Sequence, residues 1–238
     1  MRFLWYVCLT SFHQLQSDTS SEITILTISS REAYLGRLIP VSSRDTKHPR
    51  NRVLFPSNLT RLQAIKTLMP SEQEAFAYFD DNSAKSALKA YNDFTTFLET
   101  DGPYDGVIAF SQAVPLVSSW MIQQVRQGKP IEATFKCAVF FSAGDLPYDL
   151  DALQSGSNAF LREKEPGAVI DIPTAHVWGE ADWVADTAME FTKLCKADTR
   201  SFFVHKGGHE IPGSSAEDAV TRSVNIIRRA IQLAEVVV

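Results

Sequence analysis

The sequence predicts an α/β fold with a mainly parallel sheet and helices on both of its faces. Apolar runs of strand length, at residues 104–110, 135–142, 173–179 and 201–205, alternate with segments of helical periodicity. Apolar runs of this kind suit parallel strands that are buried on both faces, and their alternation with helices is typical of α/β proteins. The chain has 238 residues, of which 45% are hydrophobic. We therefore expect one domain over residues 1–238.

The chain begins with a short apolar run, residues 1–10, that contains one basic residue. A signal peptide is an alternative interpretation, but the run lacks a clear small-x-small cleavage site. We therefore predict that it forms the first core strand.

Two helices are predicted from apolar residues that recur on one face. The first starts at Asn82 or Ser83, either of which can act as the N-cap, and Gly102 and Pro103 stop it. The second lies at the C-terminus. The two apolar faces consist of Ala84, Ala87, Leu88, Tyr91, Phe94 and Leu98, and of Val220, Val224, Ile227, Ile231 and Ala234.

Residues 11–70 show little organisation. Residues 22–28 alternate enough to predict a strand, whereas residues 42–52 are basic and almost free of apolar side chains, which predicts an exposed loop. Two origins fit this region: a divergent insertion, or altered splicing or a frame error at the level of the gene.

Ser111 stands where the apolar run 104–110 meets a helical segment that carries Pro115 in its first turn. A serine on such a strand-to-helix turn is the nucleophile elbow of α/β-hydrolases, in which the helix N-terminus directs N–H groups at developing negative charge. The usual pattern is G-x-S-x-G, and here Ala109 and Ala113 replace the two glycines. Taken alone, the pattern favours an ordinary N-cap serine over a nucleophile.

Two further residues follow strands in the order that this fold requires. Asp182 follows the apolar run 173–179, and His209 follows the run 201–205 in a glycine-rich loop. The order Ser, Asp, His predicts a catalytic triad in which His209 takes the proton of Ser111 and Asp182 orients the imidazole. Alternatives are His205 as the base and Asp186 as the acid. His176 lies within a strand and is expected to be a core residue.

Several motifs carry a resemblance to a known family. They are residues 75–80 (AFAYFD), 102–107 (GPYDGV), 110–112 (FSQ), 176–179 (HVWG) with Asp182, and 207–212 (GGHEIP). From about residue 71 onward the chain resembles the FSH family of serine hydrolases. This resemblance implies a small α/β-hydrolase with little or no cap, related to fungal thioesterases that release polyketides from their synthases.

The chain departs from this family at two places that bear on oxyanion binding. The resemblance implies a His-Gly turn after the first strand that supplies one oxyanion donor, but residues 11–14 read SFHQ, and residues 1–70 diverge from the family pattern. The Gln112 N–H is the other expected donor. Ala113 should crowd the elbow and displace that N–H, because strand and helix pack closely there.

Composition argues against several other classes of function. The net charge of −5 provides no basic surface, so we expect neither nucleic acid nor a membrane as a partner. Cys8, Cys137 and Cys195 lack metal-site spacing and are expected to be thiols in the reducing cytoplasm. The acids at 145, 149 and 151 are expected to be turn and cap residues, so we predict no metal and no cofactor.

The predicted function is a serine hydrolase acting on a carboxylic ester or thioester. The resemblance implies an acyl or polyketide chain as the substrate, with a polyketide synthase as a possible partner in secondary metabolism. The alternative is a binding or accessory protein with the hydrolase fold whose turnover is weakened by the two departures. Residues 145–170 are the expected substrate-facing excursion.

Overall fold

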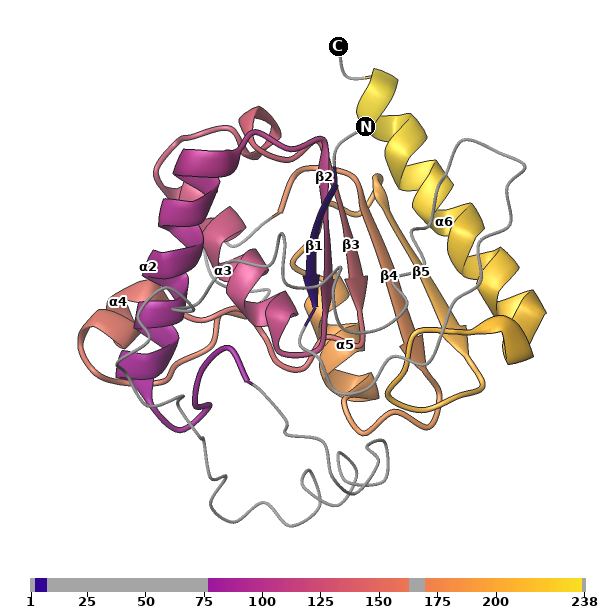
Figure 1. The fold of residues 1–238 in the computed structure, drawn as a ribbon, viewed down its shortest axis with the longest axis horizontal. Helices are drawn as coiled ribbons and strands as arrows, with labels where there is room; N and C mark the ends of the chain where they lie inside the picture. The colour runs from indigo at the N-terminus through magenta and orange to yellow at the C-terminus, as the bar shows by residue number, and fades with distance from the viewer. Residues whose placement is uncertain (1–2, 8–76, 163–169, 237–238) are drawn as a thin grey trace, which may run out of the picture.

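A computed structural model describes residues 3–7, 77–162 and 170–236, and the statements below concern this part of the chain. Five strands form one sheet in sequential order, and every neighbouring pair is parallel (Figure 1). The strands are β1 (Phe3–Val7), β2 (Gly106–Phe110), β3 (Cys137–Phe141), β4 (Thr174–Gly179) and β5 (Arg200–His205). The prediction of a mainly parallel α/β sheet is confirmed.

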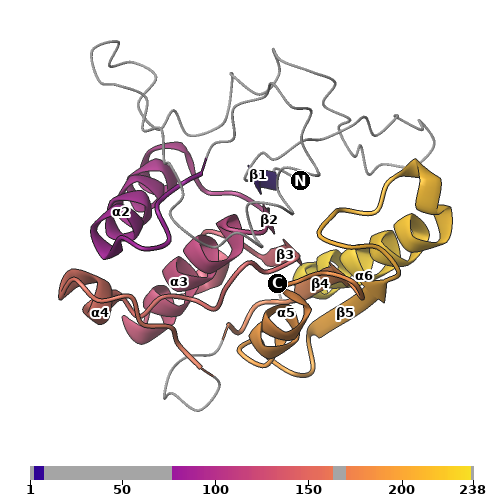
Figure 2. The same cartoon turned by 90° about the horizontal axis from the view of Figure 1, so that it is seen from below.

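Helices cover both faces of the sheet. Figure 2 shows α2, α3, α4 and α5 on one side of the strands and α6 on the other. The helices are α2 (Ala84–Asp101), α3 (Ala113–Arg126), α4 (Leu150–Gln154), α5 (Ala185–Thr192) and α6 (Glu217–Val236), with 3₁₀ turns η2 (Ile131–Ala133) and η3 (Ser214–Ala216). No helix in the described ranges is long and apolar enough to cross a bilayer.

Successive side chains of β2 belong alternately to the two hydrophobic cores. Val107 and Ala109 belong to the core beneath α2 and α3, whereas Ile108 and Phe110 belong to the core beneath α6. All five residues of β2 are buried, and β3 and β4 are buried throughout as well. The largely apolar runs that form β2, β3 and β4 are therefore explained by strands that contact a helical layer on each side.

The observed elements confirm most local expectations. Phe3–Val7 is a strand, and Ser83 rather than Asn82 caps α2, since its side chain accepts a hydrogen bond from the Ser86 N–H. The predicted strand at 22–28, the basic loop at 42–52 and the SFHQ segment at 11–14 lie outside the described residues.

His176 is a buried core residue, as expected. Its Nε2 lies 2.9 Å from the Thr174 Oγ1, and its ring contacts those of Phe140 and Phe191. Burial, assisted by the charge of Arg200, lowers the pKa of His176 from 6.5 to about 3. The imidazole therefore remains neutral in the native protein over the range in which it becomes charged in the unfolded chain.

A pH dependence of stability follows from this shift. Below about pH 6.5 His176 is protonated in the unfolded chain but stays neutral in the native protein. His176 therefore destabilises the fold progressively as the pH falls toward 3. Between pH 7 and about pH 4.5 this residue should remove about 2–3 kcal/mol from the free energy of unfolding. In His176→Leu the free energy of unfolding should not contain this pH-dependent contribution, as measured by urea unfolding at the two pH values. Equal pH dependence in both proteins would contradict this account.

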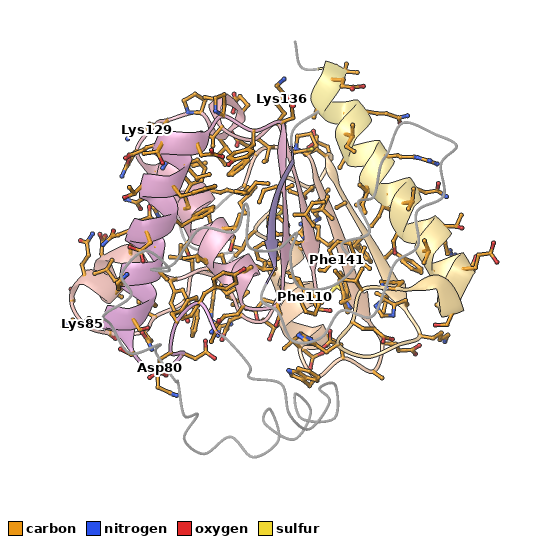
Figure 3. All side chains as sticks on the ribbon, in the orientation of Figure 1. Asp80, Lys85, Phe110, Lys129, Lys136 and Phe141 are labelled. Carbon is orange, nitrogen blue, oxygen red and sulfur yellow. The ribbon has the colours of Figure 1, made fainter. Side chains whose placement is uncertain are left out.

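The topology gathers the ends of the strands at one edge. Because all the strands are parallel, their carboxyl ends lie together, and ligands of α/β proteins bind at this edge. Phe110 and Phe141, the last residues of β2 and β3, lie close together there in Figure 3. Ser111, Ser142, Asp182 and His209 all follow strands at this edge.

Candidate active site

Ser111 occupies a sharp turn between β2 and α3. Its φ is +54°, in the left-handed region, and its N–H donates to the Phe141 carbonyl at 3.0 Å. The Ser111 carbonyl accepts from the Val114 N–H at 3.1 Å, so the chain enters α3 immediately. The turn leaves the serine side chain partly exposed at the carboxyl edge of the sheet, which is the geometry of a nucleophile elbow.

Ser111, His209 and Asp182 form one hydrogen-bonded chain. Ser111 Oγ lies 2.8 Å from His209 Nε2, and His209 Nδ1 lies 2.9 Å from Asp182 Oδ1. The side chains of His209 and Asp182 are only 4% and 0% exposed. Residues separated by 98 and 27 positions in the sequence are thus brought together in the order predicted.

The surroundings of Asp182 favour its charged form. Burial alone would raise the pKa of this carboxyl, but other contacts outweigh burial and lower the pKa below its ordinary value. In order of effect they are the hydrogen bond and charge of His209, the Val184 N–H and the Ser142 hydroxyl. An ionised Asp182 can accept a hydrogen bond from an Nδ1 proton of the imidazole, and Nε2 is the nitrogen that faces Ser111.

The alternatives for the base and the acid are not part of this chain of hydrogen bonds. His205 is buried at the end of β5, where its Nδ1 accepts from the Gly207 N–H at 3.0 Å. Burial lowers the pKa of His205, with partial opposition from Glu210 and Asp182. Asp186 is exposed in the first turn of α5. His205 therefore supports the loop that carries His209.

Two glycines permit the close approach of loops at the site. A Cβ on Gly144 would lie 3.0 Å from the Ser111 carbonyl carbon and 3.2 Å from the Gln112 nitrogen. A Cβ on Gly179 would lie 2.2 Å from the carbonyl oxygen of Gly207. The first glycine lets the segment after β3 pack on the elbow, and the second lets the His209 loop cross the end of β4.

The side chain of Gln112 has a function that the sequence did not reveal. Its Oε1 accepts from the Tyr78 N–H at 2.9 Å, and its Nε2 donates to the Phe79 carbonyl at 3.0 Å and to Asp81 Oδ1 at 2.7 Å. These bonds attach residues 78–81 to the elbow. The only sequence signal was the joint occurrence of the FSQ and AFAYFD motifs.

Trp183 covers one side of the proposed base. Its ring stacks on His209 with centroids 4.1 Å apart and an interplanar angle of 29°, and 43% of the residue remains exposed. Phe110 contacts the same imidazole at a centroid distance of 5.0 Å. The imidazole thus contacts two aromatic rings, and an apolar surface lies beside Ser111 and His209.

Asp149 and the two cysteines of the described ranges have local environments that the structure defines. Asp149 caps α4 by accepting from the N–H groups of Asp151 and Ala152, as expected for a cap residue. Within residues 3–7, 77–162 and 170–236, no three His, Cys, Asp or Glu side chains are grouped to hold a metal ion. Burial raises the pKa of Cys137 and of Cys195 to about 12, so both remain thiols.

Comparison with known proteins identifies the family. The sequence profile described as serine hydrolase (FSH1) matches residues 47–220, which extends the similarity beyond the motifs that begin near residue 71. The chain belongs to the FSH1 family of serine hydrolases. An elbow serine that is hydrogen-bonded to a histidine is what a serine hydrolase requires.

Curated relatives of this FSH1-family hydrolase are named esterases and hydrolases. Esterase FPY3 of Fusarium mangiferae is 37% identical over 164 residues, covering 67% of this chain and 73% of that protein. Hydrolase phiM of a fungal species is 28% identical over 184 residues, covering 74% and 82%. Esterase OVCA2 of Xenopus tropicalis is 26% identical, covering 63% and 60%.

Solved structures similar to this FSH1-family hydrolase are more distant in sequence. A serine hydrolase involved in carbazole degradation, the CarC enzyme, is 13% identical with a TM-score of 0.42, covering 61% of this chain and 72% of that one. Mouse alpha/beta hydrolase domain-containing protein 10 is 10% identical with a TM-score of 0.42, covering 60% and 70%. The predicted α/β-hydrolase class is confirmed by the family match together with the parallel sheet and the strand-to-helix turn at Ser111 of this chain.

Proposed function

We propose that Ser111, His209 and Asp182 form the catalytic triad of an esterase. Ser111 attacks the acyl carbon while His209 Nε2 takes the hydroxyl proton, and Asp182 stabilises the resulting imidazolium. His209 returns the proton to the departing alcohol or thiol, and water then hydrolyses the acyl-enzyme by the same route. The 2.8 Å contact between Ser111 Oγ and His209 Nε2 is the observation that carries this proposal.

The Gln112 N–H is the proposed oxyanion donor within this part of the chain. It belongs to the residue after the nucleophile, which supplies one donor in enzymes of this fold. The hydrogen bonds of the Gln112 side chain hold this residue in place. The second donor, which the resemblance takes from a His-Gly turn, has no counterpart in the sequence of residues 11–14 (SFHQ).

Removing the methyl group of Ala113 should increase activity. Ala113 is fully buried as the first residue of α3, directly after the proposed donor. Ala113→Gly should let the Gln112 N–H move closer to the oxyanion and raise kcat, with an upper bound of about 10²–10³-fold, the contribution of one donor. Initial rates of p-nitrophenyl acetate hydrolysis measure the effect. Exchange of residues 1–70 for a segment with the His-Gly turn should raise kcat further.

A matched control separates this effect from the flexibility of glycine. Ala87→Gly places the same change in α2, where the alanine is equally buried but remote from the elbow. This variant should lower stability without raising kcat. Rapid hydrolysis of thioesters by the parent enzyme, with no increase of kcat in Ala113→Gly, would contradict this prediction. It would show that the parent enzyme already has both oxyanion donors in place.

The proposed substrate is an acyl ester or thioester with an apolar acyl chain, such as a polyketide carried on a synthase. The half-exposed ring of Trp183 beside His209 offers a surface on which an acyl or aromatic group can pack. The similarity to Esterase FPY3 of Fusarium mangiferae supports the ester. The thioester rests on the motifs by which the sequence resembles polyketide-releasing thioesterases.

Matched substrates test this assignment. We would measure kcat and KM for acetyl and octanoyl groups, each as the p-nitrophenyl ester and as the N-acetylcysteamine thioester. Trp183→Ala should raise KM for the octanoyl substrates more than for the acetyl ones. Phe202→Ala removes an exposed aromatic ring in the middle of β5 and should leave KM unchanged for both the octanoyl and the acetyl substrates. Equal effects on short and long chains would argue against Trp183 as the acyl contact.

A further inference from the structure

Ser142 stands between the acid and the nucleophile of the proposed site. It directly follows β3, and its N–H donates to the Val177 carbonyl of β4 at 2.8 Å. Two residues later, the Gly144 N–H donates to the Ser111 carbonyl at 3.1 Å. One short turn, residues 142–144, is thus bonded both to the strand that leads to Asp182 and to the elbow that carries Ser111.

The backbone of Ser142 is strained. Its φ is +45°, and among the described residues other than glycine only Ser111 shares a positive φ. A side chain at such a φ is unfavourable, and glycine would relieve the strain. Strain that is kept at a site edge indicates that the serine side chain contributes something that glycine cannot.

Two buried oxygen atoms that follow neighbouring strands both need a partner. Ser142 is 1% exposed, and its Oγ makes no hydrogen bond of ordinary geometry within the described residues. The same is true of Asp182 Oδ2, whereas Oδ1 accepts from the Val184 N–H and pairs with His209. Burying a hydroxyl and a carboxylate oxygen without partners is unfavourable, and a hydroxyl can rotate to meet an acceptor.

The two groups already influence each other. The Ser142 hydroxyl is among the contacts that lower the pKa of Asp182, after burial, His209 and Val184. A hydrogen bond to a carboxylate favours its charged form. The lowered pKa of Asp182 therefore agrees with a contact between these two buried groups.

We propose that Ser142 is a positioning residue whose hydroxyl donates to Asp182 Oδ2 and so fixes the oxygen that faces His209. The inference rests on the proposed function, since it acts through the acid of that triad. With Oδ2 held by Ser142 and Oδ1 by Val184 and His209, the carboxylate cannot rotate about its terminal bond. The imidazole then remains aligned with Ser111.

A double-mutant cycle tests this inference. Ser142→Gly removes both the hydroxyl and the strain, and Ser142→Ala removes the hydroxyl alone. Either change should lower kcat for p-nitrophenyl acetate and the rate of fluorophosphonate labelling by about 10-fold to 100-fold, the value of one hydrogen bond to a charged group. KM should remain within about twofold, and Ser142→Gly should melt no lower than the alanine variant.

The decisive arm places Ser142→Gly in an Asp182→Asn background. If Ser142 acts through the carboxylate, the second change should lower kcat by less than about twofold, because its target is already lost. The inference would be overturned if the kcat loss of the double variant equalled the product of the losses in Ser142→Gly and Asp182→Asn. An unchanged kcat in Ser142→Gly and in Ser142→Ala would overturn it as well. Failure of the proposed function is a separate result: Asp182→Asn would then be fully active, or the parent would not be labelled, and Ser142 would have no acid to position.

Discussion

Ser111→Ala is expected to abolish both labelling by a fluorophosphonate probe and hydrolysis of p-nitrophenyl acetate. Ser111 Oγ is hydrogen-bonded to His209 Nε2, so its removal deletes the atom that the proposed mechanism joins to the acyl group. Loss of one member of a triad that acts as a unit should lower kcat on the order of 10⁴-fold or more. Gel fluorescence measures the labelling, and initial rates measure the hydrolysis.

The fold should survive this change. Alanine adopts the +54° φ of Ser111 with no more strain than serine, and the backbone bonds to Phe141 and Val114 do not involve the side chain. Near-ultraviolet circular dichroism should therefore match that of the parent. Ser157→Ala removes an exposed serine after α4 and should keep full labelling. Undiminished labelling of Ser111→Ala would show that the nucleophile lies elsewhere.

Asp182→Asn is expected to have the second largest effect, a loss of about 10⁴-fold in kcat. The amide would present a donor where His209 Nδ1 now faces a carboxylate oxygen, so the imidazole would take the tautomer that protonates Nε2. Such an imidazole cannot accept the proton of Ser111. Initial rates of ester hydrolysis across the pH range of the parent enzyme provide the measurement.

Asp186→Asn is the matched control. This aspartate lies four residues after Asp182 in the exposed first turn of α5, so the same chemical change there should leave kcat within about twofold. A reversed ranking of these two variants would show that the acid comes from the helix rather than from the turn after β4. Retained activity in both would contradict a triad mechanism.

Strand-end positions are the part of the site that the sequence made visible. Ser111, Asp182 and His209 each follow an apolar run, and a parallel sheet places the ends of such runs at one edge. The apolar faces of α2 and α6 were predictable for a similar reason, because burial on one side of a helix imposes a period of 3.6 residues. These properties depend on the local spacing of residue types.

Contacts around the triad could not be predicted in the same way. Gln112 was expected to contribute only its N–H, yet its side chain binds residues 78–81, more than 30 positions earlier. Trp183 lies half exposed against His209, a contact that joins the turn after β4 to the loop after β5. The spacing of residue types contains no information about which loops meet across the edge of a sheet.

The sequence by itself determined the class of fold, the order of the reacting residues and the family, because each depends on local pattern and on motifs. Only the tertiary structure decided which histidine faces Ser111. His205 and His209 are four residues apart, but a tight turn through Gly207 and Gly208 beside Gly179 directs only the second toward the elbow. The tertiary structure also bonded the turn that begins at Ser142 to the strand that leads to Asp182, since β3 and β4 align residues that are 36 positions apart in the chain.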